Sequence, residues 1–339
     1  MRATIRDVAK KAGYSISTVS LVLNNKNVSI PQSTRDKVLA AVKALDYRPN
    51  QLAVSMVTKK TNVIGLIIPD NSNMFFADLS KAIEVAAHKA GYNLIYGNSS
   101  NDSGHDIEYM RMFTDRQVDG IIFAKSASIC AEDDIRAMQF IRESKIPFVS
   151  VDRELRGNNI RSVLLDNRRG GYLATRHLLE LGHRKIGCVT GPLDLMSSHE
   201  RLEGYRDALD EYGVPYKEEL IAEGDFQMAG SEKPVLQLLR QNVTGIFSFN
   251  DMMAYSIYQV MARRSLRIPQ DISLVGFDDL WLSDFLQPPL TTVHQPVEEI
   301  GRKAVAALVS AMNGEDAGQQ NSVLMPTLHV RASTCAISR

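Results

Sequence analysis

Polar side chains follow many of the apolar runs in this 339-residue chain, at the points where those runs end. The residues at these points are Asp70, Asn73, Asp152, Arg153, Asn250, Asp251, Asp278 and Gln295. Carboxylates, amides and guanidinium groups gathered in one place can form dense, often bidentate hydrogen bonds with a ligand. Arg201 adds a second guanidinium group, and Phe75, Phe76 and Phe226 add flat apolar faces. Sugars need both kinds of contact, so the set predicts a sugar-binding cleft; the alternative is that some members are helix caps or strand-end ion pairs.

The sequence offers little that could perform catalysis. Asp152 and Asp278 could form an acid/base pair, but we expect the nearby arginines to keep both ionised, which suits binding better. The chain contains no G-x-S-x-G, G-x-x-x-x-G-K-[ST] or G-x-G-x-x-G motif. Its three cysteines lie far apart, and its seven histidines form no ligand cluster along the sequence. We therefore predict that the protein is not an enzyme and has no catalytic residues, metal site or cofactor.

From Asn62 onward, short apolar runs alternate with helical patterns. The runs are VIGLIIPD, NLIYGNSS, GIIFAK, PFVSVDR, SVLLDN, KIGCVTGP, GIFSFND and ISLVGFDD, followed later by LTTVHQP. Continuous Val/Ile/Leu-rich strands separated by helices indicate a parallel sheet covered on both faces. There are too many units for one small sheet, so two doubly wound lobes are expected. Ligands in such folds bind at the carboxyl ends of the strands, where the polar residues above lie.

The stretch Thr4–Asn25 predicts a helix-turn-helix. Apolar residues recur at helical spacing up to Gly13, which suits a tight turn, and Ser15 is a plausible N-cap of a second helix. That helix is expected to bury Val19, Val22 and Leu23 and to expose Ile16, Ser17, Thr18, Ser20 and Leu21. Such a second helix enters the major groove of DNA, although a helical interaction bundle would show the same pattern.

Charge favours DNA over the bundle. Residues 1–60 carry eleven Lys and Arg against three acids, while the whole chain balances at 39 of each. The body therefore carries an acidic excess of eight, equal to the basic excess of the head. This distribution predicts a polyanion partner for the head alone, the alternative being a solvated basic face without a partner.

A third helix and a short connecting segment follow. Ser29-Ile30-Pro31 predicts the start of the helix, with Val38, Leu39, Val42 and Leu45 facing the core. Residues 50–60 place Leu52, Ala53 and Met56 at helical spacing but are too short to form a stable helix alone. The segment could fold on docking into a minor groove with Met56 as a wedge, or it could be a plain linker.

Several motifs resemble those of the lactose/galactose-repressor (LacI/GalR) family of transcription factors. They are IRDVAKKAGYSISTVSLVLN, Tyr47-Arg48-Pro49-Asn50, GHRKIGCVTGP, RLEGYRDAL, IPQDISLVGFDD and PPLTTVHQP, and together they span essentially the whole chain. The resemblance implies a homodimeric repressor that binds a palindromic operator in double-stranded DNA. It also implies a hinge helix and a two-lobed core like that of periplasmic sugar-binding proteins, with three chain crossings between the lobes.

The implied domains are a head at 1–48, a hinge at 49–60, a first lobe at 61–163 and 293–323, and a second lobe at 164–292 and 324–339.

No apolar run is long enough to span a membrane and the N-terminus lacks a signal-peptide core, so we expect a cytoplasmic protein. These features argue against a periplasmic solute receptor. A sugar-active α/β enzyme is a further possible class of protein, but this sequence shows no nucleophile–base pair for it.

The resemblance also implies roles for residues of the head and hinge. Ile16, Ser17 and Leu21 match positions that contact base edges, and Met56 matches the leucine inserted into the minor groove. The positions that match phosphate contacts are Thr4, Ser20, Asn24 and Asn50. Leu21 stands where arginine is frequent, which removes a guanine contact, and Val54-Ser55-Met56 replaces the commoner Arg-Ser-Leu.

Ten residues match the ligand set of ribose-type binding proteins: Asn73, Phe75, Phe76, Asp152, Arg153, Arg201, Phe226, Asn250, Asp278 and Gln295. Leu195 stands where purine-binding members carry an arginine, which counts against a nucleobase. A ribose-like pentose is therefore the first expected effector, with a hexose second and a nucleoside as a further alternative.

Overall fold

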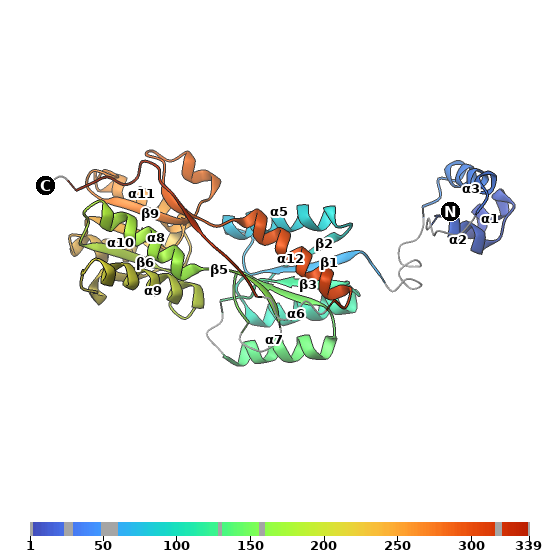
Figure 1. Cartoon of the computed structure of the whole chain (residues 1–339), viewed down its shortest axis with the longest axis horizontal. Coiled ribbons are helices and arrows are strands. Elements are labelled where there is room, and N and C mark those ends of the chain that lie inside the picture. Colours follow the sequence, from blue (N-terminus) through green and yellow to red (C-terminus); the bar gives the residue numbers. More distant parts are fainter. Residues whose placement is uncertain are drawn as a thin grey trace. The chain divides into compact units, whose positions relative to one another are not determined.

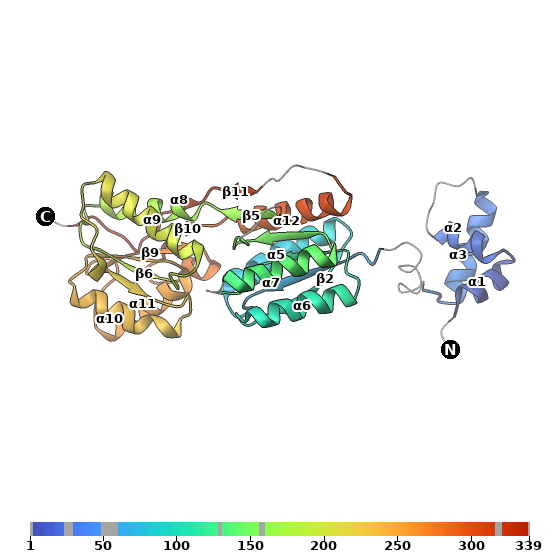
Figure 2. The same ribbon diagram turned by 90° about the horizontal axis from the view of Figure 1, so that it is seen from below.

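The computed structural model describes residues 3–23, 30–48, 60–127, 131–155, 160–315 and 321–337. The chain divides into two compact units, Met1–Thr61 and Asn62–Arg339. Figures 1 and 2 show a small all-helical unit at the N-terminus and a larger unit in which helices cover two sheets. Among the described residues, no helix is long and apolar enough to cross a membrane.

The N-terminal unit, called the head below, begins with the two helices that the sequence predicted, α1 (Ile5–Ala12) and α2 (Ile16–Leu23). Thr4 and Asp7 form a capping box, in which each side chain bonds to the other residue's backbone N–H. Gly13 ends α1 at φ 73°, a conformation that glycine adopts without strain. The hydroxyl of Ser15 accepts a hydrogen bond from the Thr18 N–H at 3.1 Å, as expected of an N-cap.

The third helix, α3 (Gln32–Ala44), closes a small core of the head. Fully or nearly buried side chains from all three helices form this core: Val8, Ala9, Val19, Val22, Val38 and Ala41. The prediction that Leu39 faces the core was wrong, since its side chain is 48% exposed. Ala41 occupies the inward position instead, because it lies three residues from Val38 and Leu39 is turned about 100° away.

The first lobe is built on a parallel sheet with strand order β11-β5-β4-β3-β1-β2. Its strands are β1 (Val63–Ile68), β2 (Asn93–Asn98), β3 (Gly120–Phe123), β4 (Phe148–Val151), β5 (Arg161–Leu165) and β11 (Ser322–Leu324). Helices α5 (Met74–Lys89) and α12 (Val297–Met312) cover one face, and α6 (Ser103–Asp115) and α7 (Ala131–Ser144) cover the other (Figure 1). This double cover explains why β3 and β4 are buried along their whole length.

The second lobe repeats the arrangement with strand order β12-β10-β9-β8-β6-β7. Its strands are β6 (Ile186–Thr190), β7 (Ile221–Glu223), β8 (Gly245–Ser248), β9 (Ser273–Asp278), β10 (Thr291–His294) and β12 (Thr327–His329), the last antiparallel to β10. Helices α8 (Asn167–Glu180) and α9 (Met196–Glu211) cover one face, and α10 (Glu232–Arg240) and α11 (Asp251–Arg263) the other (Figure 2). In both lobes the strand order reverses beside the first strand, between β1 and β3 and between β6 and β8.

The chain passes between the two sheets three times, after β5, after β10 and after β11. These strands end at Leu165, His294 and Leu324, one or two residues beyond the lobe boundaries expected from the sequence. All nine apolar runs contain a strand, so the predicted fold class is confirmed. The sequence did not predict the three-residue strands β7, β11 and β12, which are too short to show a pattern.

Candidate functional sites

A small cavity of about 30 Å³ lies between the two lobes. Its lining is Asn73, Phe75, Phe76, Asp152, Arg153, Ser197, Arg201, Phe226, Asn250, Asp278 and Gln295. Ten of these eleven residues are the ten that the sequence singled out, and only Ser197, on α9, was missed. The volume is about that of one or two waters, so a sugar can enter only if the lobes move apart.

The ends of strands and the first turns of helices bring these residues together. Asp152 and Arg153 follow β4, Asp278 ends β9, and Gln295 follows β10. Two asparagines at the cavity are also N-caps: the Asn73 side chain accepts the Phe75 N–H at 3.0 Å, and the Asn250 side chain accepts the Met253 N–H at 2.9 Å. These two asparagines therefore serve both as caps and as cavity lining.

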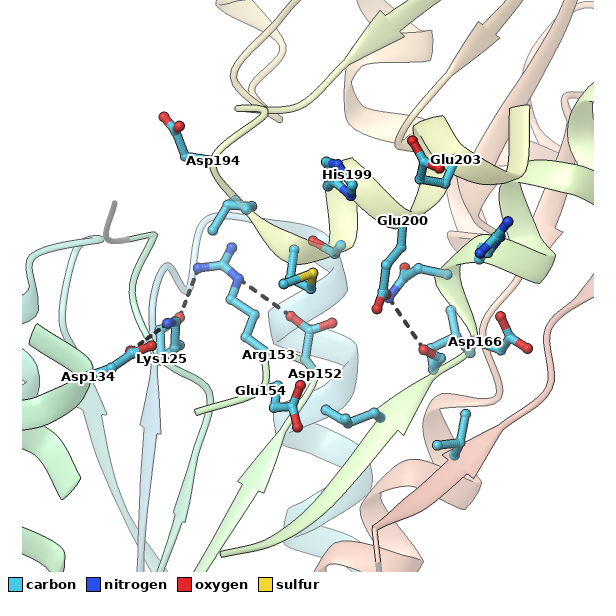
Figure 3. Close-up of a pocket in the computed structure, with 18 residues that line it drawn as sticks. Lys125, Asp134, Asp152, Arg153, Glu154, Asp166, Asp194, His199, Glu200 and Glu203 are labelled. Carbon is cyan, nitrogen blue, oxygen red and sulfur yellow. Dashed lines mark hydrogen bonds and ion pairs between the residues drawn. The ribbon is translucent and has the colours of Figure 1, made fainter. Parts of the chain in front are cut away.

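The first lobe contributes Arg153, whose position is fixed by three neighbours. Its Nη1 donates a hydrogen bond to the carbonyl oxygen of Lys125 at 2.8 Å, and its Nε lies 3.6 Å from Oδ2 of Asp152 (Figure 3). The guanidinium carbon lies 5.4 Å from the centre of the Phe76 ring, within the range of a cation–π contact. The group is thereby held at the cavity before any ligand contacts it.

The second lobe contributes Arg201, which is 5% exposed and lies on α9. Its Nε donates to Oδ1 of Asn167 at 2.9 Å, its Nη1 donates to the Phe249 carbonyl, and its guanidinium carbon lies 3.5 Å from the Phe277 ring centre. Glycine makes this placement possible, because a Cβ on Gly171 of α8 would overlap the Arg201 carbonyl oxygen. The close approach of α8 to α9 thus positions the arginine.

Burial dominates the electrostatics of the cavity. It raises the pKa of the Asp152 and Asp278 carboxyls above their usual range, although Arg153 and Arg201 act in the opposite direction. Burial thus acts against the arginines that were expected to keep both carboxyls ionised, because so little water remains in the closed cavity. Asp278 accepts a hydrogen bond from Nε2 of Gln295 at 2.7 Å.

Three cavity residues have positive φ angles. The angles are 64° at Asp152, 64° at Phe226 and 110° at Asp278. L-residues adopt this region rarely and at a cost of order 1–3 kcal/mol each, and such strain clusters at ligand sites. No residue pattern in the sequence indicated these conformations.

Two further polar residues near the cavity have roles that differ from the sequence-based interpretation. Asp70, after β1, accepts a hydrogen bond from Nε2 of Gln227 at 3.2 Å, which joins the lobes directly. Asp251 does not line the cavity; it is buried in the second lobe, where it accepts hydrogen bonds from Ser283 and Thr292. Burial raises the pKa of Asp251 to about 7 against those hydrogen bonds.

A larger pocket of about 450 Å³ adjoins the cavity and shares Asp152, Arg153 and Ser197 with it. Figure 3 shows Lys125 and Asp134 on one side of this pocket and Glu200 and Asp166 on the other. Nζ of Lys125 is paired with Oδ1 of Asp134 at 2.5 Å. The volume falls within the usual range for small-molecule sites. Seven carboxylates against three cationic residues make its lining acidic.

The head presents the residues predicted to face DNA on α2. Ile16 is 43% exposed, Ser17 is exposed, and Thr18, Ser20 and Leu21 are partly exposed. The Thr4 hydroxyl donates to Oδ2 of Asp7 at 2.7 Å, so it already has a partner within the capping box. The remaining predicted DNA contacts lie outside the described residues: Asn24, Asn50 and Met56.

Known proteins resemble both parts of the chain. The model of bacterial regulatory proteins of the lacI family matches residues 4–50, and that of the periplasmic binding protein-like domain matches residues 175–334. The HTH-type transcriptional regulator DegA of Bacillus subtilis is 38% identical over the full length of both chains. This chain belongs to the LacI family of bacterial regulatory proteins. The predicted family and the predicted class of DNA-binding transcriptional regulator are confirmed.

Other LacI-family relatives cover nearly the whole chain. The ribose operon repressor of Escherichia coli K12 is 34% identical over 98% of this chain and 99% of its own. The HTH-type transcriptional repressor PurR of Aliivibrio salmonicida is 34% identical over 98% of both chains. These relatives are transcriptional regulators and not enzymes, in agreement with the sequence analysis.

Solved structures agree with the family assignment. The lac repressor dimer bound to operator and the anti-inducer ONPF has a TM-score of 0.88 at 27% identity and covers 99% of this chain and 100% of its own. A LacI-family regulator from Enterococcus faecium with bound ribose has a TM-score of 0.74 at 30% identity, covering 81% of this chain and 100% of its own.

Proposed function

We propose that this regulator is a repressor whose operator binding is controlled by a small sugar, a ribose-like pentose, bound between the lobes. The observation that carries the proposal is the meeting of both arginines, the two carboxyls and the aromatic rings at one interlobe cavity. Such a set supplies paired donors and acceptors for ring hydroxyls together with stacking faces for C–H groups. No catalytic residue, metal or cofactor takes part in this function.

The choice of a pentose has support from two relatives. One is named for the ribose operon, and another was solved with ribose bound. A purine effector is disfavoured at Leu195, which is 5% exposed and lines the adjoining pocket with a side chain that cannot hydrogen-bond a base. A hexose is the second candidate, since ring hydroxyls of either sugar suit the same donors and acceptors.

A ligand in this position can act as a switch. Arg153 and Phe76 belong to the first lobe, and Arg201 and Phe226 to the second, so a sugar that touches both lobes favours their closed arrangement. It can shift the DNA-binding equilibrium only by its difference in affinity for the two arrangements. Three chain crossings connect the lobes and would carry this motion.

We also propose the domain division given by the sequence: a head at 1–48, a hinge at 49–60, and lobes at 61–163 with 293–323 and at 164–292 with 324–339. In the head, Ile16, Ser17 and Leu21 are proposed to face base edges, and Thr18 is proposed to lie at the DNA beside them. The proposed phosphate contacts are Thr4, Ser20, Asn24 and Asn50, with Met56 as the minor-groove wedge. A regulator that acts on DNA in this way works in the cytoplasm.

Exchange of Leu21 for arginine tests the base-reading role of α2. Leucine has no hydrogen bond to give, so it is expected to contact a thymine methyl group. Leu21→Arg should move the preference toward guanine at one half-site position, by about 1–3 kcal/mol. Binding-site selection with both proteins measures the change. An unchanged consensus would mean that this side chain does not face the groove.

A homodimer is proposed from an exposed apolar pair as well as from the solved lac repressor dimer. Trp281 and Phe285 are 60% and 71% exposed, and their rings meet edge to face at 5.9 Å. Large exposed aromatic groups mark protein–protein contact sites. The double change Trp281→Glu and Phe285→Lys should convert the dimer into monomers, as measured by sedimentation velocity. These monomers should bind the operator more weakly. If the variant remained fully dimeric, the interface would lie elsewhere.

Titration of the intact protein tests the function as a whole. Calorimetry with pentoses, hexoses and nucleosides identifies the effector, and operator binding is then measured with and without it. We expect a pentose to bind and to change operator affinity, while glucose and adenosine bind more weakly. Operator binding that responds to none of these ligands would contradict the sugar switch but not the DNA-binding role.

A further inference from the structure

Outside the cleft, two histidine side chains contact the same carboxylate oxygen of an aspartate. Asp279 directly follows β9, His294 ends β10, and His329 ends β12. Nδ1 of His294 and Nδ1 of His329 each lie 2.8 Å from Oδ2 of Asp279. The two imidazole rings are stacked, with centroids 4.7 Å apart and planes inclined by 9°.

Strand pairing brings these residues together although His294 and His329 lie far apart in the sequence. In the antiparallel pair of β10 and β12, Thr327 lies opposite His294, so His329 is its diagonal neighbour on the same face of the sheet. On the other side, β10 pairs with β9 so that His294 lies opposite Asp278, next to Asp279. The sequence predicted no metal site because its histidines form no cluster along the chain, and the three-residue strand β12, which brings His329 beside His294, shows no local pattern.

The guanidinium group of Arg331 fixes the position of the Asp279 carboxylate through its other oxygen. Nη2 of Arg331 lies 2.8 Å from Oδ1 of Asp279, and Nε of Arg331 lies 2.5 Å from Oδ1 of Asp284. The Asp279 side chain is 8% exposed, whereas those of His294 and His329 are 31% and 44% exposed. The oxygen that faces the histidines is therefore preoriented, and both imidazoles are partly exposed in the single chain.

We propose that Asp279, His294 and His329 bind a zinc ion. Two imidazole nitrogens and one carboxylate oxygen form a common zinc ligand set, with a water in the fourth position. The three ligand atoms lie within 4.8 Å of one another, and zinc bonds of about 2.0–2.2 Å require only small rotations of the side chains. The proton on each Nδ1 moves to Nε2 through solvent, so that each Nδ1 lone pair becomes available to the metal. Arg331 then orients the ligating carboxylate, as outer partners do at known metal sites.

The test uses the intact chain without a polyhistidine tag, titrated with zinc chloride in a calorimeter. We expect one zinc per chain, and at least about tenfold weaker binding in His294→Gln and in His329→Gln. The matched control is His88→Gln, which changes an exposed histidine of α5 and should bind zinc like the unaltered protein. Cobalt(II) provides a second readout, because a tetrahedral site gives intense visible absorption bands that both cluster variants should lose.

Melting temperatures without metal separate a binding defect from a folding defect, and none of the variants should differ by more than a few degrees. The proposal is overturned if the unaltered chain takes up no stoichiometric zinc, or if the two cluster variants bind zinc as tightly as His88→Gln. In either case the cluster would serve only to tie β9, β10 and β12 together. Sugar and operator binding are not needed for this test, so its outcome is independent of the proposed function.

Discussion

Removal of residues 1–60 is expected to eliminate operator binding and to leave a folded core that still binds its effector. The hydrophobic cluster of the head contains only residues of the head, and the rest of the chain has large buried clusters of its own. Residues 1–60 also carry a basic excess of eight, which the acidic excess of the remaining chain balances. Operator binding by the intact protein should weaken steeply with salt, with a log–log slope of about −5 to −9, as roughly 6–10 phosphates release counterions.

Fluorescence anisotropy with a labelled palindromic operator measures both effects. A scrambled duplex of the same length serves as the control for non-specific binding, which should share the salt dependence but not the affinity. Circular dichroism and effector titration establish that the truncated core is folded. If this core still bound the operator, the assignment of DNA binding to the head would be wrong.

Loss of Arg201 is expected to abolish the response to the effector and to leave operator binding without effector nearly unchanged. The guanidinium group is buried, and its neighbours Asn167 and Asp278 would lose a cationic partner in a cavity with little water. Removing one partner of a buried polar set costs about 2–5 kcal/mol, which lowers effector affinity by tens- to thousands-fold. Calorimetric titration of Arg201→Ala with the sugar, paired with operator binding with and without sugar, measures the outcome.

A second variant distinguishes loss of effector binding from a folding defect. Asp278→Asn keeps the shape and the acceptor for Gln295, and asparagine tolerates the positive φ at this position, so its loss of effector binding would come from the missing carboxyl. Arg206→Ala is the matched control, because Arg206 lies on the same helix but pairs with Glu203 near the surface. If Asp278→Asn and Arg201→Ala kept full sugar affinity, the effector site would have to be elsewhere.

The sequence predicted the fold well wherever periodicity was long. Continuous apolar runs such as Val63–Ile68 are typical of strands covered on both faces, and the structure buries them as expected. Strands β7, β11 and β12 have only three residues each, so tertiary contacts rather than local pattern determine them. Leu39 was misplaced for a related reason, since one residue of helical phase decides whether a side chain faces in or out.

The sequence predicted those cavity residues that lie at the ends of strands or that match the family pattern. Ser197 gave no signal, because serine in the first turn of a helix is common. The positive φ angles left no pattern in the sequence either. The contact between Asp70 and Gln227 and the rise of the carboxyl pKa values depend on how closely the lobes approach. The separation of the lobes is a property of the folded core, and no local stretch of sequence predicts it. The cluster at Asp279 depends in the same way on strand pairing.

The three passages between the lobes also determine the order in which a growing chain can complete its parts. The buried core of the head lies entirely between Val8 and Ala41, so the head can fold soon after it leaves the ribosome. The first lobe must wait for α12 and β11, which end at Leu324 and follow nearly all of the second lobe in the sequence. Until then Ile300, Ala304 and Leu308 are not in place, and apolar surface of the first sheet stays uncovered. During synthesis, the part that binds DNA is therefore finished well before the part that senses the effector.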